Sequence, residues 1–193
     1  VRGDAGLSDI ISRIYENPII AALRREEDLP DALKSNVNVI FILHADIFNI
    51  NHLVDSIKSA GKRALIHIDF LEGLGRDDKA LDYIVEVVKP DGIISTRNTQ
   101  IKHAMDKGIF TIQRFFLVDS MSFDTTIKSL HSLKPDMIEI LPGVMPSVVK
   151  RIASHVSLPI IVGGLIDSKE DIISALNAGA IGTSVGKKEL WEL

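Results

Sequence analysis

The sequence predicts a small (β/α)8 barrel, an α/β fold of the TIM-barrel type, with one domain over residues 1–193. Apolar segments rich in β-branched residues recur roughly every 20 to 25 residues, and a polar or helix-like stretch follows each of the first seven. The segments are continuous apolar runs, as expected of parallel strands that helices cover on one side. We assign the strands to residues 18–24, 39–45, 64–70, 92–96, 110–116, 137–141, 159–164 and 180–185.

An amphipathic helix is expected before the first strand. Leu7, Ile10, Ile11 and Ile14 follow the i, i+3, i+4, i+7 spacing of a helix with one apolar face. We expect this helix to pack on the bottom of the barrel, and residues 1–6 before it to be a flexible tail.

Helix starts and stops separate the later strands. Apolar residues at helical spacing predict a helix over 51–59, Asp77 and Asp78 open another, and Ser168 begins a capping-box-like sequence before a third. Glycine or proline ends the helices, because glycine adopts the left-handed conformation of a C-cap and proline cannot continue a helix. These stops lie at residues 60–62, 89–92, 107–108, 134–136 and 177–179.

Composition limits the classes of function. Hydrophobic residues make up 46% of the 193 residues, which suffices for a barrel core, although barrels of this type usually have about 250 residues. The absence of cysteine excludes disulfides, thiol catalysis and cysteine-ligated metals. A net charge of −4 gives the chain no overall attraction for nucleic acid, so RNA binding would need a local basic patch.

The location of the protein follows from its apolar runs. The longest, such as residues 19–23 and 39–43, are far shorter than the roughly 18 to 20 residues that span a bilayer. No secretory signal pattern opens the chain. We therefore expect a soluble cytoplasmic protein that does not contact a membrane.

Polar residues gather where the predicted strands end, the face on which barrels of this class bind ligands. Gly163 and Gly164 follow the seventh strand, and Gly186 follows the eighth, where backbone N–H groups can bind a phosphate. The alternative is that the glycine pair only forms a tight turn. The other strand-end residues are Arg24, His44, Asp46, His67, Asp69, Glu72, Arg97, Arg114, Glu139, Ser184 and Lys187.

Three of these residues could act as acids and bases. His67 and Asp69 are two residues apart, so on a strand both side chains would point to the same side, and Glu139 lies inside the sixth strand. Proton transfer, ligand contact and a satisfied polar cluster in the barrel mouth all remain open. Ligand contact is favoured over proton transfer because no reaction motif accompanies the three residues.

A metal site is a further alternative, because histidine nitrogens and carboxylate oxygens suit zinc or manganese. Its ligands would come from His44, Asp46, His67, Asp69 and Glu72. The repeated His-x-Asp spacing is a weak signal, so we predict no metal. The chain also lacks the glycine-rich nucleotide-binding motifs and the nucleophile elbow of hydrolases.

The strand-end motifs, taken in order, resemble the glycerol uptake operon antiterminator family from about Asn17 onward. The resemblance rests on Pro18-Ile19-Ile20, His67-Ile68-Asp69, Ile94-Ser95-Thr96-Arg97, Ile112-Gln113-Arg114, Glu139-Ile140-Leu141-Pro142-Gly143, Gly163-Gly164 and Leu190-Trp191. It implies a non-enzymatic bacterial regulator that senses glycerol 3-phosphate and acts on leader mRNA to promote transcription of glycerol-utilisation genes.

The resemblance also implies ligand contacts and partners. The expected effector ligand is glycerol 3-phosphate, and the expected partner is leader mRNA. We expect no cofactor. A homodimer is one way to widen the RNA-binding surface. Ser184-Val185-Gly186-Lys187 departs from the family's more continuous Ser/Thr/Asn stretch, so Lys187 would supply a charge instead. The contacts carried over by motif are Arg24, His67, Asp69, Arg97, Arg114, Glu139, Gly143, Gly163, Gly164 and Ser184.

The RNA surface is poorly defined by the sequence, because no aromatic platform or known RNA module accompanies the basic residues. The candidates are Arg24, Arg25, Lys62, Arg63, Arg97, Lys102, Lys187 and Lys188. Two rival functions stay open. One is a phosphosugar or phosphotriose enzyme that uses His67, Asp69 and Glu139, and the other is a metabolite-binding protein with a protein partner.

Overall fold

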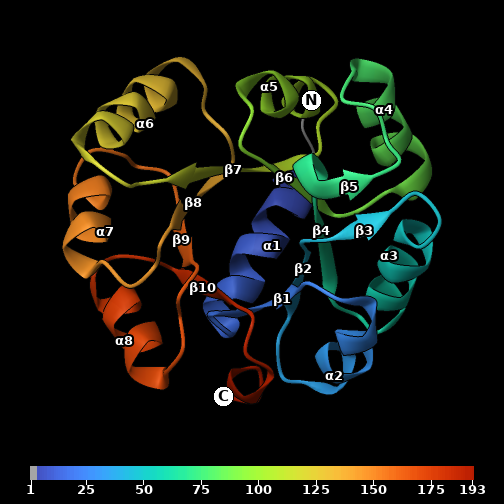
Figure 1. Ribbon diagram of the computed structural model, residues 1–193, viewed down its shortest axis with the longest axis horizontal. Helices are drawn as coiled ribbons and strands as arrows, with labels where there is room; N and C mark the ends of the chain where they lie inside the picture. The colour runs from blue at the N-terminus through green and yellow to red at the C-terminus, as the bar shows by residue number, and fades with distance from the viewer. Residues whose placement is uncertain (1–3) are drawn as a thin grey trace.

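The computed structural model describes the backbone of residues 4–193 and the side chains from Asp9 onward. Eight parallel strands form a closed barrel in the order β1-β2-β4-β6-β7-β8-β9-β10, and β10 pairs with β1 (Figure 1). The barrel strands are β1 (Ile19–Leu23), β2 (Val39–Ile42), β4 (Arg63–His67), β6 (Gly92–Ser95), β7 (Phe110–Phe116), β8 (Met137–Leu141), β9 (Ile160–Gly163) and β10 (Gly182–Val185). This arrangement confirms the predicted (β/α)8 fold.

The outer layer consists of the helices that follow the strands, which Figure 1 shows surrounding the barrel. They are α2 (Leu29–Lys34), α3 (Ile50–Ser59), α4 (Asp78–Tyr83), α5 (Asn98–Asp106), α6 (Ser120–Ser132), α7 (Pro146–Ala153) and α8 (Lys169–Asn177). Helix α4 continues into a π-helical turn at Ile84–Val88. The predicted helix starts at Asp77 and Ser168 are confirmed, since both side chains accept a hydrogen bond from the first turn.

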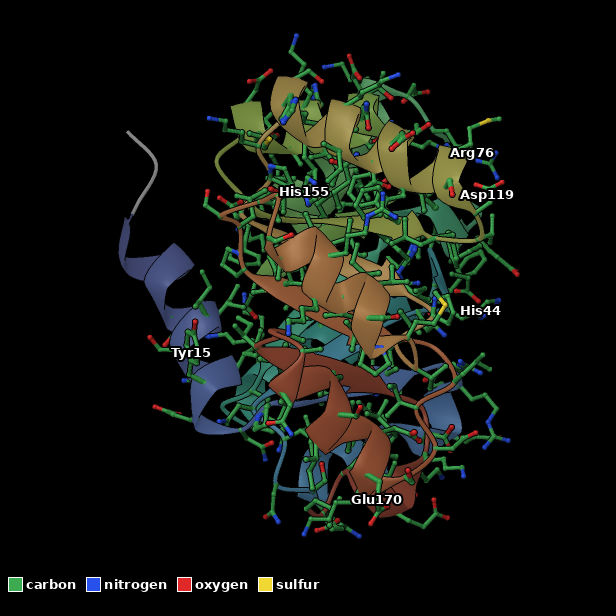
Figure 2. The ribbon with its side chains drawn as sticks, turned by 90° about the vertical axis from the view of Figure 1, so that its left-hand side faces the viewer. Tyr15, His44, Arg76, Asp119, His155 and Glu170 are labelled. Carbon is green, nitrogen blue, oxygen red and sulfur yellow. The ribbon has the colours of Figure 1, made fainter. Side chains whose placement is uncertain are left out.

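Helix α1 (Asp4–Glu16) closes one end of the barrel, as the sequence predicts. Ile10 and Ile14 belong to the cluster that fills the barrel interior, together with Phe41, Leu65 and Ile112. In Figure 2, α1 lies at the end of the barrel opposite to His44, Arg76 and Asp119, which come after strands β2, β5 and β7. Of the expected tail, residues 1–3 lie outside the described residues, and residues 4–6 belong to the helix.

The core has two parts, because inward and outward side chains alternate along the barrel strands. The inner cluster contains Ile20, Phe41 and Ile161, and the larger outer cluster lies between strands and helices and contains Ile40 and Ile138. The inner cluster fills the end of the barrel nearer to α1. Buried polar side chains, among them Arg114, Glu139 and Ser184, lie toward the other end.

Two strand predictions need correction. The third predicted strand, residues 64–70, ends at His67, and Ile68–Phe70 forms a 3-10 turn because the Asp69 carboxylate bonds to Ser95 and Thr96. The second predicted strand, residues 39–45, ends at Ile42. Ala45 instead begins a separate two-stranded sheet, in which β3 (Ala45–Asp46) pairs with β5 (Leu71–Glu72). Asp69 therefore does not share a strand face with His67.

Candidate functional site

A cavity of about 320 Å³ opens at the carboxyl end of the barrel. It lies between the ends of β1, β7, β9 and β10, the region in which barrels of this class bind phosphate. Five predicted site residues line it: Arg24, Arg114, Gly164, Ser184 and Lys187. The apolar part of its wall includes Ala22, Leu43, Leu141, Leu165 and Ile166.

Arg114 and Ser184 form the floor of the cavity, and both are hydrogen-bonded to Glu139 beneath them. Nε of Arg114 donates to Oε2 of Glu139 over 2.6 Å, and Oγ of Ser184 donates to Oε1 of the same carboxylate, also over 2.6 Å. Glu139 is fully buried, and Arg114 and Ser184 are nearly so. One carboxylate therefore holds both side chains that face the cavity at its floor.

Gly163 makes this arrangement possible. It lies on β9, between the strand of Glu139 and the strand of Ser184, and it pairs in register with Ser184. A Cβ atom at this position would clash with Oγ of Ser184 and lie 2.8 Å from Oε1 of Glu139. Gly163 thus gives the Glu139 side chain room to reach Ser184, and the phosphate contact expected of Gly163 stays a prediction.

The mouth of the cavity combines exposed backbone with an unpaired guanidinium. Gly164 and Leu165 both have positive φ angles, of 75° and 61°, and Leu165 is 68% exposed. A positive φ is uncommon outside glycine and costs energy, so it marks a backbone shape that its surroundings impose. The guanidinium carbon of Arg24 is 3.7 Å from the point where a Cβ on Gly186 would stand.

The two cations at the mouth differ in their partners. Arg24 is exposed and has no hydrogen bond or ion pair with any described residue. Nζ of Lys187 contacts both the carboxylate and the carbonyl oxygen of Asp167, at 3.2 and 3.1 Å. Arg24 is therefore the cation whose charge remains available to an anion at this mouth.

His67 is buried inside the barrel and does not line the cavity. It is 1% exposed, neither ring nitrogen has a hydrogen-bond partner among the described residues, and its ring centroid is 4.5 Å from that of Phe70. Burial, and then the positive charge of Arg114, lower the pKa of His67 to about 3. The imidazole is consequently neutral at neutral pH.

Asp69 and Arg97 lie together outside the cavity. The Asp69 carboxylate accepts hydrogen bonds from Ser95 Oγ and from the backbone and hydroxyl of Thr96, and Arg97 Nε is 4.0 Å away. Burial alone would raise the pKa of Asp69, but the hydrogen bonds from Thr96 and Ser95 hold it below its usual value. These contacts fix the Ile68–Phe70 turn against the end of β6.

Gly143 joins two loops of the site. Its N–H contacts the carbonyl oxygens of Gly163 and Gly164, at 2.7 and 3.1 Å. A Cβ at Gly143 would lie 2.9 Å from Cδ1 of Ile166. Gly143 therefore holds the loop after β8 against the loop after β9, and the cavity wall behind it depends on its small size.

Comparison with known proteins identifies the family. The family model for the glycerol-3-phosphate responsive antiterminator matches residues 19–191, nearly the whole described chain. The chain belongs to the glycerol-3-phosphate responsive antiterminator family. This result confirms the resemblance predicted from the strand-end motifs.

Relatives of this antiterminator-family chain match it over almost their whole length. It is 38% identical to the YgcP protein of Escherichia coli K12, over 95% of this chain and 96% of that protein. The crystal structure of a glycerol uptake operon antiterminator regulatory protein from Listeria monocytogenes gives a TM-score of 0.88 at 33% identity, covering 91% of this chain and 95% of that one. A related Thermotoga maritima protein gives 0.81 at 29% identity, covering 91% and 98%.

The metal alternative finds no support in this antiterminator-family barrel. Nε2 of His44 is 3.0 Å from a carboxylate oxygen of Glu72, Asp46 binds backbone N–H groups at 48 and 49, and His67 lies buried elsewhere. Among the residues described from Asp9 onward, no group of three His, Asp or Glu side chains is placed to hold a metal ion.

The basic residues predicted for RNA binding do not form one surface. Arg25 and Lys188 are both paired with Asp28, near the cavity end of the antiterminator-family barrel. Lys62 donates to the carbonyl oxygens of Ser35 and Val37, and Arg63 pairs with Asp9 of α1, at the opposite end. These four candidates are thus divided between the two ends of the barrel.

No helix in residues 4–193 of this antiterminator-family chain is both long enough and apolar enough to cross a bilayer.

The site also includes residues that the sequence reasoning did not select. Ala22, Leu43 and Leu141 form the apolar wall, and Leu165 shapes the mouth through its positive φ. The inward alternation along β1 offers a signal for Ala22, whereas the conformation of Leu165 has no signature in the sequence.

Proposed function

We propose that this chain is a cytoplasmic glycerol 3-phosphate receptor that controls transcription antitermination on the leader mRNA of glycerol-utilisation genes. Membership of the antiterminator family supports this proposal. The observation that carries its ligand-binding half is the unpaired guanidinium of Arg24, which lies beside Gly186 at the mouth of the cavity. A charged hydrogen-bond donor next to exposed backbone suits a phosphate monoester.

The size of the cavity supports a small ligand. Ligand pockets usually measure about 300 to 1,000 Å³, and the volume of about 320 Å³ lies at the lower limit. A three-carbon phosphate ester is among the smallest metabolites that carry both a phosphate and hydroxyl groups. The polar floor suits hydroxyl groups, and the apolar wall suits a short carbon chain.

The geometry favours binding over acid–base catalysis. With a pKa of about 3, His67 is a weak base, and its ring nitrogens have no partner among the described residues that could relay a proton. The Asp69 carboxylate is occupied by Ser95 and Thr96, and each oxygen of Glu139 accepts one hydrogen bond. We therefore propose that the protein acts without a cofactor or metal and senses its ligand rather than converting it.

Calorimetry tests the receptor proposal. The protein is titrated with glycerol 3-phosphate, glycerol and inorganic phosphate, and the titrations are repeated with Gly164→Val. We expect glycerol 3-phosphate to bind most tightly, and we expect the variant to lose this binding because valine disfavours the positive φ at Gly164. Equal affinity for glycerol and glycerol 3-phosphate would refute a phosphate site.

A second titration tests the regulatory half. If the ligand shifts a population toward an RNA-competent state, leader RNA must raise the affinity for glycerol 3-phosphate by the factor by which the ligand raises RNA affinity. Equal ligand affinity with and without leader RNA would refute the gating mechanism.

Phosphorus NMR with the same ester tests the enzyme alternative, which requires product formation that Asp69→Asn and Glu139→Gln abolish.

A further inference from the structure

The floor of the cavity offers hydrogen-bonding groups of both kinds. Ser184 uses its hydroxyl proton in the bond to Glu139, so its oxygen presents only lone pairs to the cavity. Arg114 uses Nε in its bond to Glu139, and its two terminal nitrogens make no hydrogen bond with the described residues. An acceptor and charged donors therefore stand together at the floor.

A hydroxyl group matches this combination, whereas a phosphate does not. A hydroxyl donates one hydrogen bond and accepts others, so it satisfies Ser184 and Arg114 at once. The oxygens of a phosphate dianion only accept, and one placed against Ser184 would meet lone pairs. Leaving such a group unpaired in a buried site costs free energy.

The distribution of charge leads to the same assignment. The charge of Arg114 is balanced by Glu139, which is completely buried 2.6 Å away, so this pair adds no net positive charge to the floor. A dianion bound there would approach a carboxylate in surroundings where charges are poorly screened. At the mouth, by contrast, Arg24 is exposed and no carboxylate of the described residues pairs with it.

We infer that the cavity binds its ligand in one orientation, with the phosphate at Arg24 and Gly164 and a hydroxyl-bearing end on Ser184 and Arg114. The ligand class is then a small phosphorylated polyol with a free hydroxyl at the end away from the phosphate. This inference rests on the proposed receptor function. It adds that Ser184 and Arg114 recognise the hydroxyl groups of the ligand. Glu139 acts as a positioning residue, because it holds both Ser184 and Arg114.

The test is a set of titrations with three ligands: glycerol 3-phosphate, propyl phosphate, which has the same carbon chain without hydroxyls, and inorganic phosphate. For the wild-type protein we expect propyl phosphate to bind about ten- to a hundredfold more weakly than glycerol 3-phosphate. Ser184→Ala should weaken glycerol 3-phosphate about tenfold and leave propyl phosphate and inorganic phosphate unchanged.

Arg24→Gln should weaken all three ligands by a similar factor, because each presents its phosphate to the mouth. Arg76→Gln is the matched control: Arg76 is an exposed arginine at the same end of the barrel that does not line the cavity (Figure 2). It removes the same charge and should leave all three affinities unchanged.

Propyl phosphate binding as tightly as glycerol 3-phosphate to the wild-type protein would overturn the inference without any variant, and it would leave the receptor proposal intact. A loss of inorganic phosphate binding in Ser184→Ala would place the phosphate at the floor, and this result would also overturn the inferred orientation. If the wild-type protein bound neither ester, the proposed function itself would fail, and the inferred orientation with it.

Discussion

Nε of Arg114 lies 2.6 Å from Oε2 of Glu139, and the two side chains are 6% and 0% exposed. Removing one member of a buried ion pair leaves the other charge uncompensated, which costs about 3 to 5 kcal/mol of stability. We expect Arg114→Met to lower the free energy of unfolding by that amount, measured by urea denaturation. The double variant with Glu139→Leu should recover most of the loss, and a double variant less stable than Arg114→Met would contradict this.

Gly163 allows the Glu139 carboxylate to reach Ser184 across β9. Gly163→Ala introduces a methyl group that clashes with Oγ of Ser184, so we expect a loss of about 1 to 3 kcal/mol in the free energy of unfolding. Gly186→Ala is the matched control, because its nearest neighbours are Arg24 atoms at ordinary contact distance, 3.7 Å away. Equal losses in the two variants would show that steric room at Gly163 is not the reason for its glycine.

His67 makes stability depend on pH in a definite direction. The unfolded chain binds a proton at this histidine near pH 6.5, while burial and Arg114 hold the folded-state pKa at about 3. The unfolded state therefore binds more protons over this window, and stability falls as the pH is lowered from 6.5 toward 3. Between pH 6.5 and 4.5 the loss should be about 2 kcal/mol.

The control for this pH dependence is His67→Leu, which removes the titrating group. Subtracting its unfolding free energy from that of the wild-type protein at each pH isolates His67 from the other histidines. Asp69, whose pKa is below its usual value, contributes stability that is lost only at lower pH. Parallel pH profiles for the two proteins would show that His67 is not buried in a neutral state.

Helix α1 contributes to the barrel core through Ile14, which is fully buried in the inner cluster. Ile14→Ala should cost about 2 to 5 kcal/mol in thermal or urea unfolding, because it opens a cavity at the end of the barrel. Tyr15→Ala, at a neighbouring side chain that is 67% exposed, should change stability by less than about 0.5 kcal/mol. Similar effects for both would argue that α1 does not close the barrel in solution.

The barrel could be predicted from the sequence because mostly apolar segments recur at a regular spacing, with helix-like stretches between them. The prediction was wrong at two strand ends, for a local and a nonlocal reason. The strand predicted over residues 64–70 stops at His67, since Asp69 bonds to Ser95 and Thr96 at the end of β6. The two-residue strands β3 and β5 are too short to produce any periodicity.

The sequence predicts which strand-end residues belong to the site, but it does not predict which of them contact one another. Arg114, Glu139 and Ser184 come from three strands separated by long stretches of sequence, and only the closed barrel brings them to one floor. The same closure places His67 and Asp69 outside the cavity wall. The ligand contacts carried over from the family remain predictions, and the titrations above test them.

The central claim, that the cavity receives the metabolite that controls antitermination, is tested most directly by transcription in vitro across a leader terminator with increasing glycerol 3-phosphate. Readthrough should rise with glycerol 3-phosphate for the wild-type protein and for Arg76→Gln. For Arg24→Gln the half-maximal concentration should be at least about tenfold higher, because a charged hydrogen bond to the phosphate is lost. Readthrough that does not respond to glycerol 3-phosphate, or that responds identically in Arg24→Gln, would contradict the account.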